Sequence, residues 1–176
     1  MRVESDSREL TEEISVSSRL DAPREQVWNR VITPAGINDE MRPLMRMTLP
    51  RGMERLDISE VELGRPIGRS WILLFGLIPF DYDDLTLVRL EKGSSFLERS
   101  TMLSQRLWEH ERTLADAHGG GCEITDRVRW QPRLGLPPQP LRPLIRFFFR
   151  HRHKRLRRRF GGSDRAHELT GDLSRR

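Results

Sequence analysis

The sequence predicts one α+β domain in which a curved antiparallel sheet of about six or seven strands wraps around a long C-terminal helix. Runs of alternating apolar and polar residues joined by short turns fill the middle of the chain. The last apolar run instead repeats at helical intervals. A length of 176 residues suits a single domain with a sizeable core. We expect a flexible leader over residues 1–11, the domain over 12–160 and a polar tail over 161–176.

The chain should begin with one strand followed by two short helices. Residues 12–20 alternate between an apolar and a polar side, as in a half-buried strand. Asp-Ala-Pro at 21–23 is a typical helix start, and apolar residues at helical spacing over 27–32 make that helix amphipathic. Thr-Pro at 33–34 ends it, and a second short helical piece is expected over 34–42.

Nearly everything between residues 45 and 130 is expected to be strand. The predicted strands cover residues 45–49, 55–63, 69–75, 85–90, 96–103, 107–114 and 122–130. Turn residues separate them, notably Gly64 to Gly68, Gly76 with Pro79, Lys92-Gly93-Ser94 and the three glycines 119–121. Neighbouring strands joined by such short turns favour an antiparallel meander.

A proline-rich loop over residues 132–143 leads into the long helix. Its apolar residues recur every three, four or seven positions and are Leu141, Leu144, Ile145, Phe148, Phe149, Leu156 and Phe160. Gly161-Gly162 then stops the helix. Because a sheet with one apolar face must bury that face, we expect it to curl around this helix.

Composition narrows the class of protein. The chain is 36% hydrophobic and 32% charged, which is more polar than an average globular protein. The single cysteine, Cys122, excludes an internal disulfide and suits a reducing compartment. No apolar run approaches the length that crosses a bilayer, and the acidic N-terminus lacks the apolar core of a signal peptide. We therefore expect a cytoplasmic protein.

Two motifs resemble a known superfamily. Val16 to Val31 reads VSSRLDAPREQVWNRV, a strand followed by Ala-Pro and a helix containing Val-Trp. LWEHERTL at 107–114 precedes GGGCEITDRVRWQPRLG at 119–135. Together with the aromatic and Arg-rich last helix, these resemble the START-related SRPBCC superfamily, which includes polyketide cyclases, lipid-transfer domains and pathogenesis-related plant proteins. Many relatives have a Gly-Pro corner where this chain has Leu103-Ser104-Gln105, so that bend should be shaped differently.

The resemblance covers roughly residues 12–160 and implies a helix-grip fold with a hydrophobic cavity between sheet and helix. It also implies that Trp108 and His110 point inward, and alternation extends this to other residues. The expected lining comprises Trp71, Leu73, Phe96, Glu98, Ser100, Trp108, His110, Arg112, Asp126, Val128, Trp130, Leu144 and Phe148. A few polar groups in an apolar shell are typical of a small-molecule site. The expected function is binding of a small hydrophobic molecule, such as a lipid or a polyketide-like metabolite.

Catalysis is the alternative. His110, beside Asp126 or Glu98, is the candidate general base of an enzyme of the polyketide cyclase or dehydratase type, with Arg112 as oxyanion partner. However, Arg112 and Asp126 also satisfy each other, since buried charges must be paired. The sequence favours this structural pairing and a non-catalytic binding protein. We expect no metal and no cofactor, because the histidines lack ligand spacing and the glycines at 119–121 open no helix.

The basic charge has one main source. The net charge is +5, yet residues 142–159 alone carry nine Arg or Lys and no acid. The alternatives are a solvated helix face, contact with an anionic membrane surface, and contact with nucleic acid. The sequence favours the first and argues against the third, because the phenylalanines needed to stack on bases mostly share the apolar stripe. It carries no signal for oligomeric state.

Overall fold

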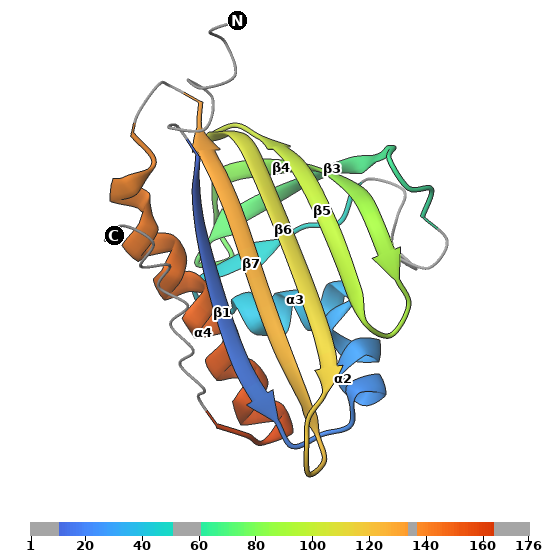
Figure 1. Ribbon diagram of the computed structural model, residues 1–176. Helices are drawn as coiled ribbons and strands as arrows, with labels where there is room; N and C mark the ends of the chain where they lie inside the picture. Colours follow the sequence, from blue (N-terminus) through green and yellow to red (C-terminus); the bar gives the residue numbers. More distant parts are fainter. Residues whose placement is uncertain (1–10, 51–60, 134–136, 164–176) are drawn as a thin grey trace, which may run out of the picture.

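The computed structural model describes residues 11–50, 61–133 and 137–163 (Figure 1). The elements in chain order are β1 (Glu12–Leu20), α2 (Arg24–Val31), α3 (Pro34–Met41), β2 (Met45–Met47), β3 (Pro66–Leu74), β4 (Ile78–Glu91), β5 (Ser95–Met102), β6 (Gln105–Asp116), β7 (Cys122–Pro132), the short 3-10 helix η2 (Gln139–Leu141) and α4 (Arg142–Phe160).

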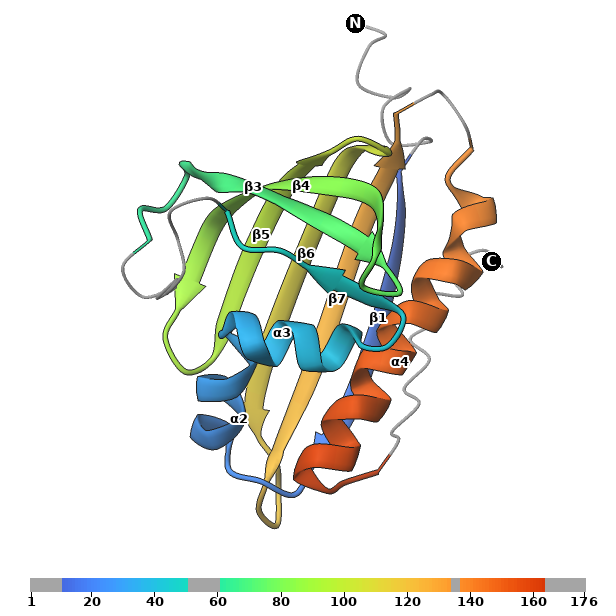
Figure 2. The same ribbon diagram turned by 180° about the vertical axis from the view of Figure 1, so that it is seen from behind.

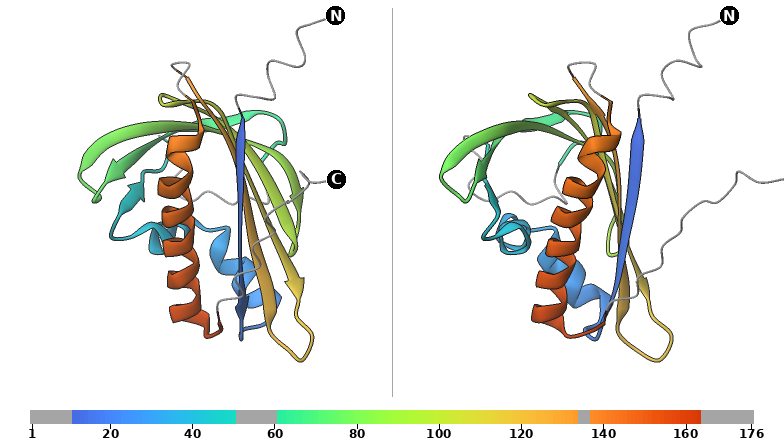
Figure 3. Two further views of the ribbon diagram at one scale, coloured as in Figure 1. Left: turned by 60° about the vertical axis from the view of Figure 1, so that its left-hand side comes forward. Right: turned by 90° about the vertical axis from the view of Figure 1, so that its left-hand side faces the viewer.

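All seven strands form one sheet in the order β1-β7-β6-β5-β4-β3-β2, and every neighbouring pair is antiparallel. The sheet is strongly curved, and α4 runs along its concave side next to β1 (Figure 3). Helices α2 and α3 cover the same side farther along the sheet (Figure 2). The predicted α+β architecture, a curved sheet around a C-terminal helix after two short helices, is thus confirmed.

The ends of α3 and α4 follow from local chemistry. The Thr33 side chain accepts a hydrogen bond from the Gly36 backbone N–H at 3.0 Å, which caps α3. A side chain at Gly36 would lie only 1.9 Å from the carbonyl oxygen of Arg30, so glycine allows α3 to pack tightly against the end of α2. Helix α4 ends before Gly161, whose φ of 73° favours glycine, as predicted.

Strand β4 is much longer than the predicted strand over 85–90. Its first half was not predicted from the sequence because acidic residues, which are typical of loops, are frequent there. Two of these acids have clear partners. Asp81 accepts a hydrogen bond from the backbone N–H of Leu103 at 2.8 Å and so holds the bend between β5 and β6. Asp84 accepts two hydrogen bonds from Arg69 on the exposed face. The unusual corner is therefore stabilised by a carboxylate.

The core consists of apolar clusters between the helices and the sheet. One joins α2 to the sheet through residues such as Trp28 and Leu114. Another joins α4 to β1 and β7 through Phe149 and the fully buried Trp130. None of the described helices has both the length and the apolarity to cross a bilayer. The predicted strand over 55–63 lies largely outside the described residues, as do most of the expected leader and tail.

Candidate functional site

Arg112 is the centre of a buried ionic network on the concave face. It lies opposite Asp126 in the register of β6 and β7, and its Nε and Nη2 donate to the two carboxylate oxygens at 2.7 and 2.8 Å. Its Nη1 and Nη2 donate to the carboxylate of Glu40 on α3 at 2.9 and 2.8 Å. All three side chains are buried, so one guanidinium bridges two carboxylates inside the protein.

Helix α4 closes this network with two residues of the basic run. Arg152 Nε donates to Glu40 at 3.0 Å. The imidazole of His153 lies 3.1 Å from Asp126 through Nε2 and 2.9 Å from the hydroxyl of Ser18 through Nδ1. The expectation that the run from Arg150 to Arg159 forms one solvated face is therefore wrong for two of its members.

Helical spacing explains the correction. Phe149 and Leu156 are buried, and positions 152 and 153 lie between them on the same face of the helix. That spacing was present in the sequence as the signal for buried Arg152 and His153. Glu40 was also not predicted from the sequence. It lies one helical turn after Gly36, and both residues are buried on α3.

The network balances its own charges. Burial alone would raise the pKa of the Asp126 carboxyl, but Arg112 and then His110 hold that pKa well below its usual range. Burial opposes ionisation of Glu40 too, and Arg112 and Arg152 still lower its pKa. The structural pairing of Arg112 with Asp126 that the sequence favoured is therefore present. Two acids and two guanidinium groups satisfy one another.

His110 connects this network to Glu98 on β5. Its Nε2 lies 2.9 Å from Asp126 Oδ1, and its Nδ1 lies 3.6 Å from Glu98 Oε1. The rings of Phe96 and Phe149 pack edge-on against the imidazole, with centroids 5.4 and 5.2 Å away. Burial disfavours the imidazolium, but Asp126 and Glu98 outweigh it and raise the pKa. An imidazole with a carboxylate at each nitrogen is poorly placed to accept a proton from a substrate.

A pocket lies beside this region, between α3 and the inner face of β3, β4 and β5. It holds about 700 Å³ of free space including the part open to solvent, and the centres of water molecules can occupy about 60 Å³ of it. Most of its walls are apolar. The lining residues are Val31, Pro34, Ile37, Asn38, Met47, Thr48, Leu49, Pro50, Ile67, Ser70, Leu85, Leu87, Phe96 and Glu98.

Alternation placed most of the expected inward residues on the correct face. Those that are buried or half-buried on the concave side are Phe96, Glu98, Ser100, Trp108, His110, Arg112, Asp126, Val128 and Trp130. Only Phe96 and Glu98 of these line the pocket. Four of the expected wall residues instead belong to the apolar cluster that α4 forms with the sheet: Val128, Trp130, Trp108 and Phe148. The pocket described above lies on the α3 side of the concave face.

Two expected wall residues, Trp71 and Leu144, were placed wrongly. Trp71 is 47% exposed and packs edge-on against Tyr82, while Ser70 and Ile72 are the buried residues of β3. Leu73 does not line the pocket either, and the register of β3 shifts between residues 72 and 73. Leu144 is 61% exposed, because the buried stripe of α4 runs through Ile145 instead. A one-residue error reverses a strand face and rotates a helix face.

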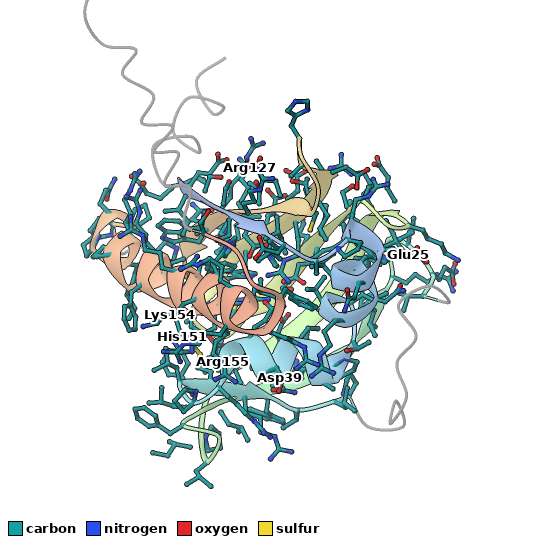
Figure 4. The ribbon with its side chains drawn as sticks, turned by 90° about the horizontal axis from the view of Figure 1, so that it is seen from below. Glu25, Asp39, Arg127, His151, Lys154 and Arg155 are labelled. Atoms are coloured by element: carbon teal, nitrogen blue, oxygen red, sulfur yellow. The ribbon has the colours of Figure 1, made fainter. Side chains whose placement is uncertain are left out.

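The rest of the basic run is only partly solvated. Lys154 is exposed, whereas His151 lies 2.8 Å from the Arg42 carbonyl oxygen and Arg155 donates to the Asp39 carbonyl oxygen on α3 at 3.0 Å (Figure 4). Arg157 donates to the Ser18 hydroxyl at 2.7 Å. Arg150 and Arg158 are also exposed. In the described part of the chain, no three His, Cys, Asp or Glu side chains are grouped so as to hold a metal ion.

Comparisons with known proteins agree with this architecture. A family model described as a domain of unknown function, DUF8410, matches residues 18–160, and no curated protein matches the sequence. Among solved structures, the protein CV1439 from Chromobacterium violaceum has a TM-score of 0.63 and 15% identity, covering 86% of this chain and 99% of its own. A START superfamily protein from Mycobacterium smegmatis has a TM-score of 0.60 and 12% identity, with coverage of 85% and 96%.

A third solved structure is DynU16, a protein of the dynemicin biosynthetic locus. It has a TM-score of 0.51 and 18% identity, covering 85% of this chain and 46% of its own. These similarities show the fold, which is the START-related helix-grip fold that the sequence motifs implied. One fold of this kind carries many activities, so the function has to come from the site.

Proposed function

Because the chain belongs to the DUF8410 family, whose description assigns no activity, we propose from its pocket that it binds a small, mostly apolar molecule between α3 and strands β3 to β5. The supporting observation is an apolar pocket with a few polar side chains in its wall, of which Glu98 is the charged one. Mostly apolar walls favour an apolar body, and the polar groups favour one orientation of it.

The size of the pocket favours a compact ligand. One water needs roughly 10–15 Å³ of the volume open to water centres, so 60 Å³ accommodates about four to six waters. A ring compound fits this space with its outer part in the open mouth, whereas a long acyl chain exceeds it. Of the two ligand classes suggested by the sequence, we favour a polyketide-like metabolite over a lipid.

Binding is also favoured over a reaction of the cyclase type. His110 does not line the pocket, and carboxylates face both of its nitrogens. Arg112 has no free edge for an oxyanion, because its donors face Glu40 and Asp126. The candidate base and its partner therefore act better as structural groups than as catalytic ones.

A filled pocket tests the proposal. Leu85 lines the pocket, and Thr86 is the next residue on the opposite face of β4. Leu85→Trp should lower the affinity for a compact apolar probe such as 1-naphthol by more than about tenfold in calorimetric titration, and Thr86→Trp should leave it within about threefold. Equal affinities for the two variants, with both shown to be folded by circular dichroism, would overturn the proposal.

Contact with an anionic membrane is the second candidate, and one surface favours it. Phe147 and Leu144 are exposed on the outer side of α4, at helical spacing from the exposed Lys154 and Arg158. Sedimentation with vesicles of phosphatidylserine and phosphatidylcholine should then decrease on Phe147→Ser and with added salt. Sedimentation that is unchanged by both would exclude this surface.

A further inference from the structure

A second group of polar side chains lies on the inner face of β3, β4 and β5, apart from the Arg112 network. Ser70 is opposite Asp83 in the sheet register, and Leu85 is opposite Ser100. Ser70 and Leu85 line the pocket. Asp83 precedes Leu85 by two residues, so its side chain shares the pocket-facing side of β4. Asp83 and Ser100 do not line the pocket themselves, but each is the sheet neighbour of a residue that does, Ser70 and Leu85.

Two atoms of this group are buried without a hydrogen bond. Asp83 is 2% and Ser100 is 3% exposed. Within the described residues, neither Asp83 Oδ1 nor Ser100 Oγ has a hydrogen-bond partner. Native proteins rarely leave buried polar atoms unpaired, so such a pair next to a pocket indicates that a ligand supplies the missing donors.

The charges point to the type of donor. Glu40 and Asp126 face Arg112 and Arg152, while Glu98 faces His110 at 3.6 Å. In the described part of the chain, no basic side chain lies within ion-pair distance of Asp83. Asp83 is therefore a buried acid without a counter-ion among the residues that the structure describes.

The neighbours of Asp83 are themselves acidic. Burial is the largest influence and the Glu98 carboxylate the next, and with Asp81 and Asp84 they raise the pKa of Asp83 to about 7. The hydroxyl of Ser100 lies near enough to oppose this rise, but the two side chains do not reach hydrogen-bond geometry. A cation placed between Asp83 and Glu98 would relieve the repulsion between them.

We propose that the pocket prefers ligands whose buried end is a protonated primary amine, held between the carboxylates of Glu98 and Asp83 with the hydroxyl of Ser100 as a further acceptor. An ammonium group has three donors and no acceptor, which matches a site made of unpaired acceptors. An alcohol would satisfy only one of them, and a carboxylate would be repelled. This inference rests on the proposed binding function and names the chemistry of the ligand.

Three probes of matched shape test the preference: 2-phenylethylamine, 2-phenylethanol and 3-phenylpropanoate. Calorimetric titration of the full chain at pH 8 should show the amine binding at least about tenfold more tightly than the alcohol, with the carboxylate weakest. Asp83→Asn and Glu98→Gln should each lower the affinity for the amine by about tenfold and leave the affinity for the alcohol within about threefold of the wild-type value. Asp84→Asn is the matched control, since Asp84 is the next residue of β4 and pairs with Arg69 on the other face.

A pH series assigns the effect to one residue. Amine affinity should decrease between pH 8 and pH 6 as Asp83 takes up a proton, and this decrease should be absent in Asp83→Asn. A decrease that persists in Asp83→Asn would belong to another group, such as His110, and would overturn the assignment.

The outcomes separate the two proposals. If the alcohol binds in the pocket and the amine has no advantage, the preference for amines is wrong and the apolar binding function stands. If the folded protein binds none of the three probes and no 1-naphthol, both are wrong. If Asp83→Asn lowers the affinity for the amine and for the alcohol equally, Asp83 has a structural role and the proposed preference is also overturned.

Discussion

Two groups of buried polar residues share the concave face of this protein, and their environments differ. Around Arg112, each carboxylate faces a guanidinium, and α3, α4, β6 and β7 all contribute. Asp83, by contrast, has a buried carboxylate oxygen without a hydrogen-bond partner among the described residues, and its neighbour Ser70 lines the pocket. The same residue types thus serve two purposes. Complete pairing indicates a structural role, and incomplete pairing beside a pocket indicates binding.

The largest effect is expected from a substitution that breaks the Arg112 network. Arg112→Met should destabilise the protein by about 3–5 kcal/mol, because it removes the buried guanidinium that two carboxylates share and leaves each with weaker partners. Urea unfolding at pH 7 measures this. Arg129 on β7 is the control, since its ion pairs with Glu109 and Glu13 involve an exposed side chain, and Arg129→Met should cost less than about 1 kcal/mol. Similar losses for both variants would contradict a structural role for the network.

The pH dependence of stability should have opposite signs in the two groups. The pKa of Asp83 is raised to about 7 from 3.8, so the native state keeps a proton that the unfolded chain releases. This residue should therefore cost stability as the pH rises from about 4 through 7, on the order of 2–4 kcal/mol. Asp83→Asn should unfold at higher urea concentration than the wild type at pH 8, and the gain should disappear near pH 4.

In the Arg112 network the sign is reversed. The pKa values of Asp126 and Glu40 are lowered, so their contribution is complete above about pH 5 and is lost as the pH falls through their native values. The free energy of unfolding of Asp83→Asn should therefore still decrease below pH 4. A variant whose stability is flat in acid would show that the network carries little of the stability.

Loss of one neutral hydrogen-bonding group should have a smaller effect. Ser18→Ala removes the hydroxyl that contacts His153 at 2.9 Å and accepts a hydrogen bond from Arg157 at 2.7 Å between β1 and α4. The expected cost is about 1–2 kcal/mol, because the imidazole nitrogen loses its partner without access to water. Ser17→Ala is the control, since that hydroxyl pairs with Thr125 at a partly buried position. A smaller loss for Ser18 than for Ser17 would contradict this geometry.

The smallest expected effect tests the rotation of α4. Leu144 is exposed, so Leu144→Ala should change the free energy of unfolding by less than about 0.5 kcal/mol. Ile145 is buried against Phe149 and Trp130, and Ile145→Ala should cost about 2–4 kcal/mol. Thermal unfolding of both variants provides the comparison, and a larger loss for Leu144→Ala than for Ile145→Ala would contradict the observed rotation of α4.

The sequence by itself determined the order of the elements and the inward faces of β5, β6 and β7. Those strands are long and regular, so a period of two assigns every side chain once one is known. It also determined where α4 ends, because Gly161 suits a left-handed backbone. It indicated the pairing of Arg112 with Asp126, because neighbouring strands bring alternate residues together.

Only the tertiary structure decided where the free space lies and which polar residues have partners. The inward residues of β3 depend on a register shift, and the buried face of α4 depends on how the helix rotates against β1 and β7. Glu40 enters the Arg112 network from a helix 72 residues away in sequence. Among the described residues, the buried guanidinium groups of Arg112 on β6 and Arg152 on α4 face Glu40 and Asp126 rather than Asp83. Pairing and cavity volume depend on contacts between distant segments, and a local sequence pattern does not contain those contacts.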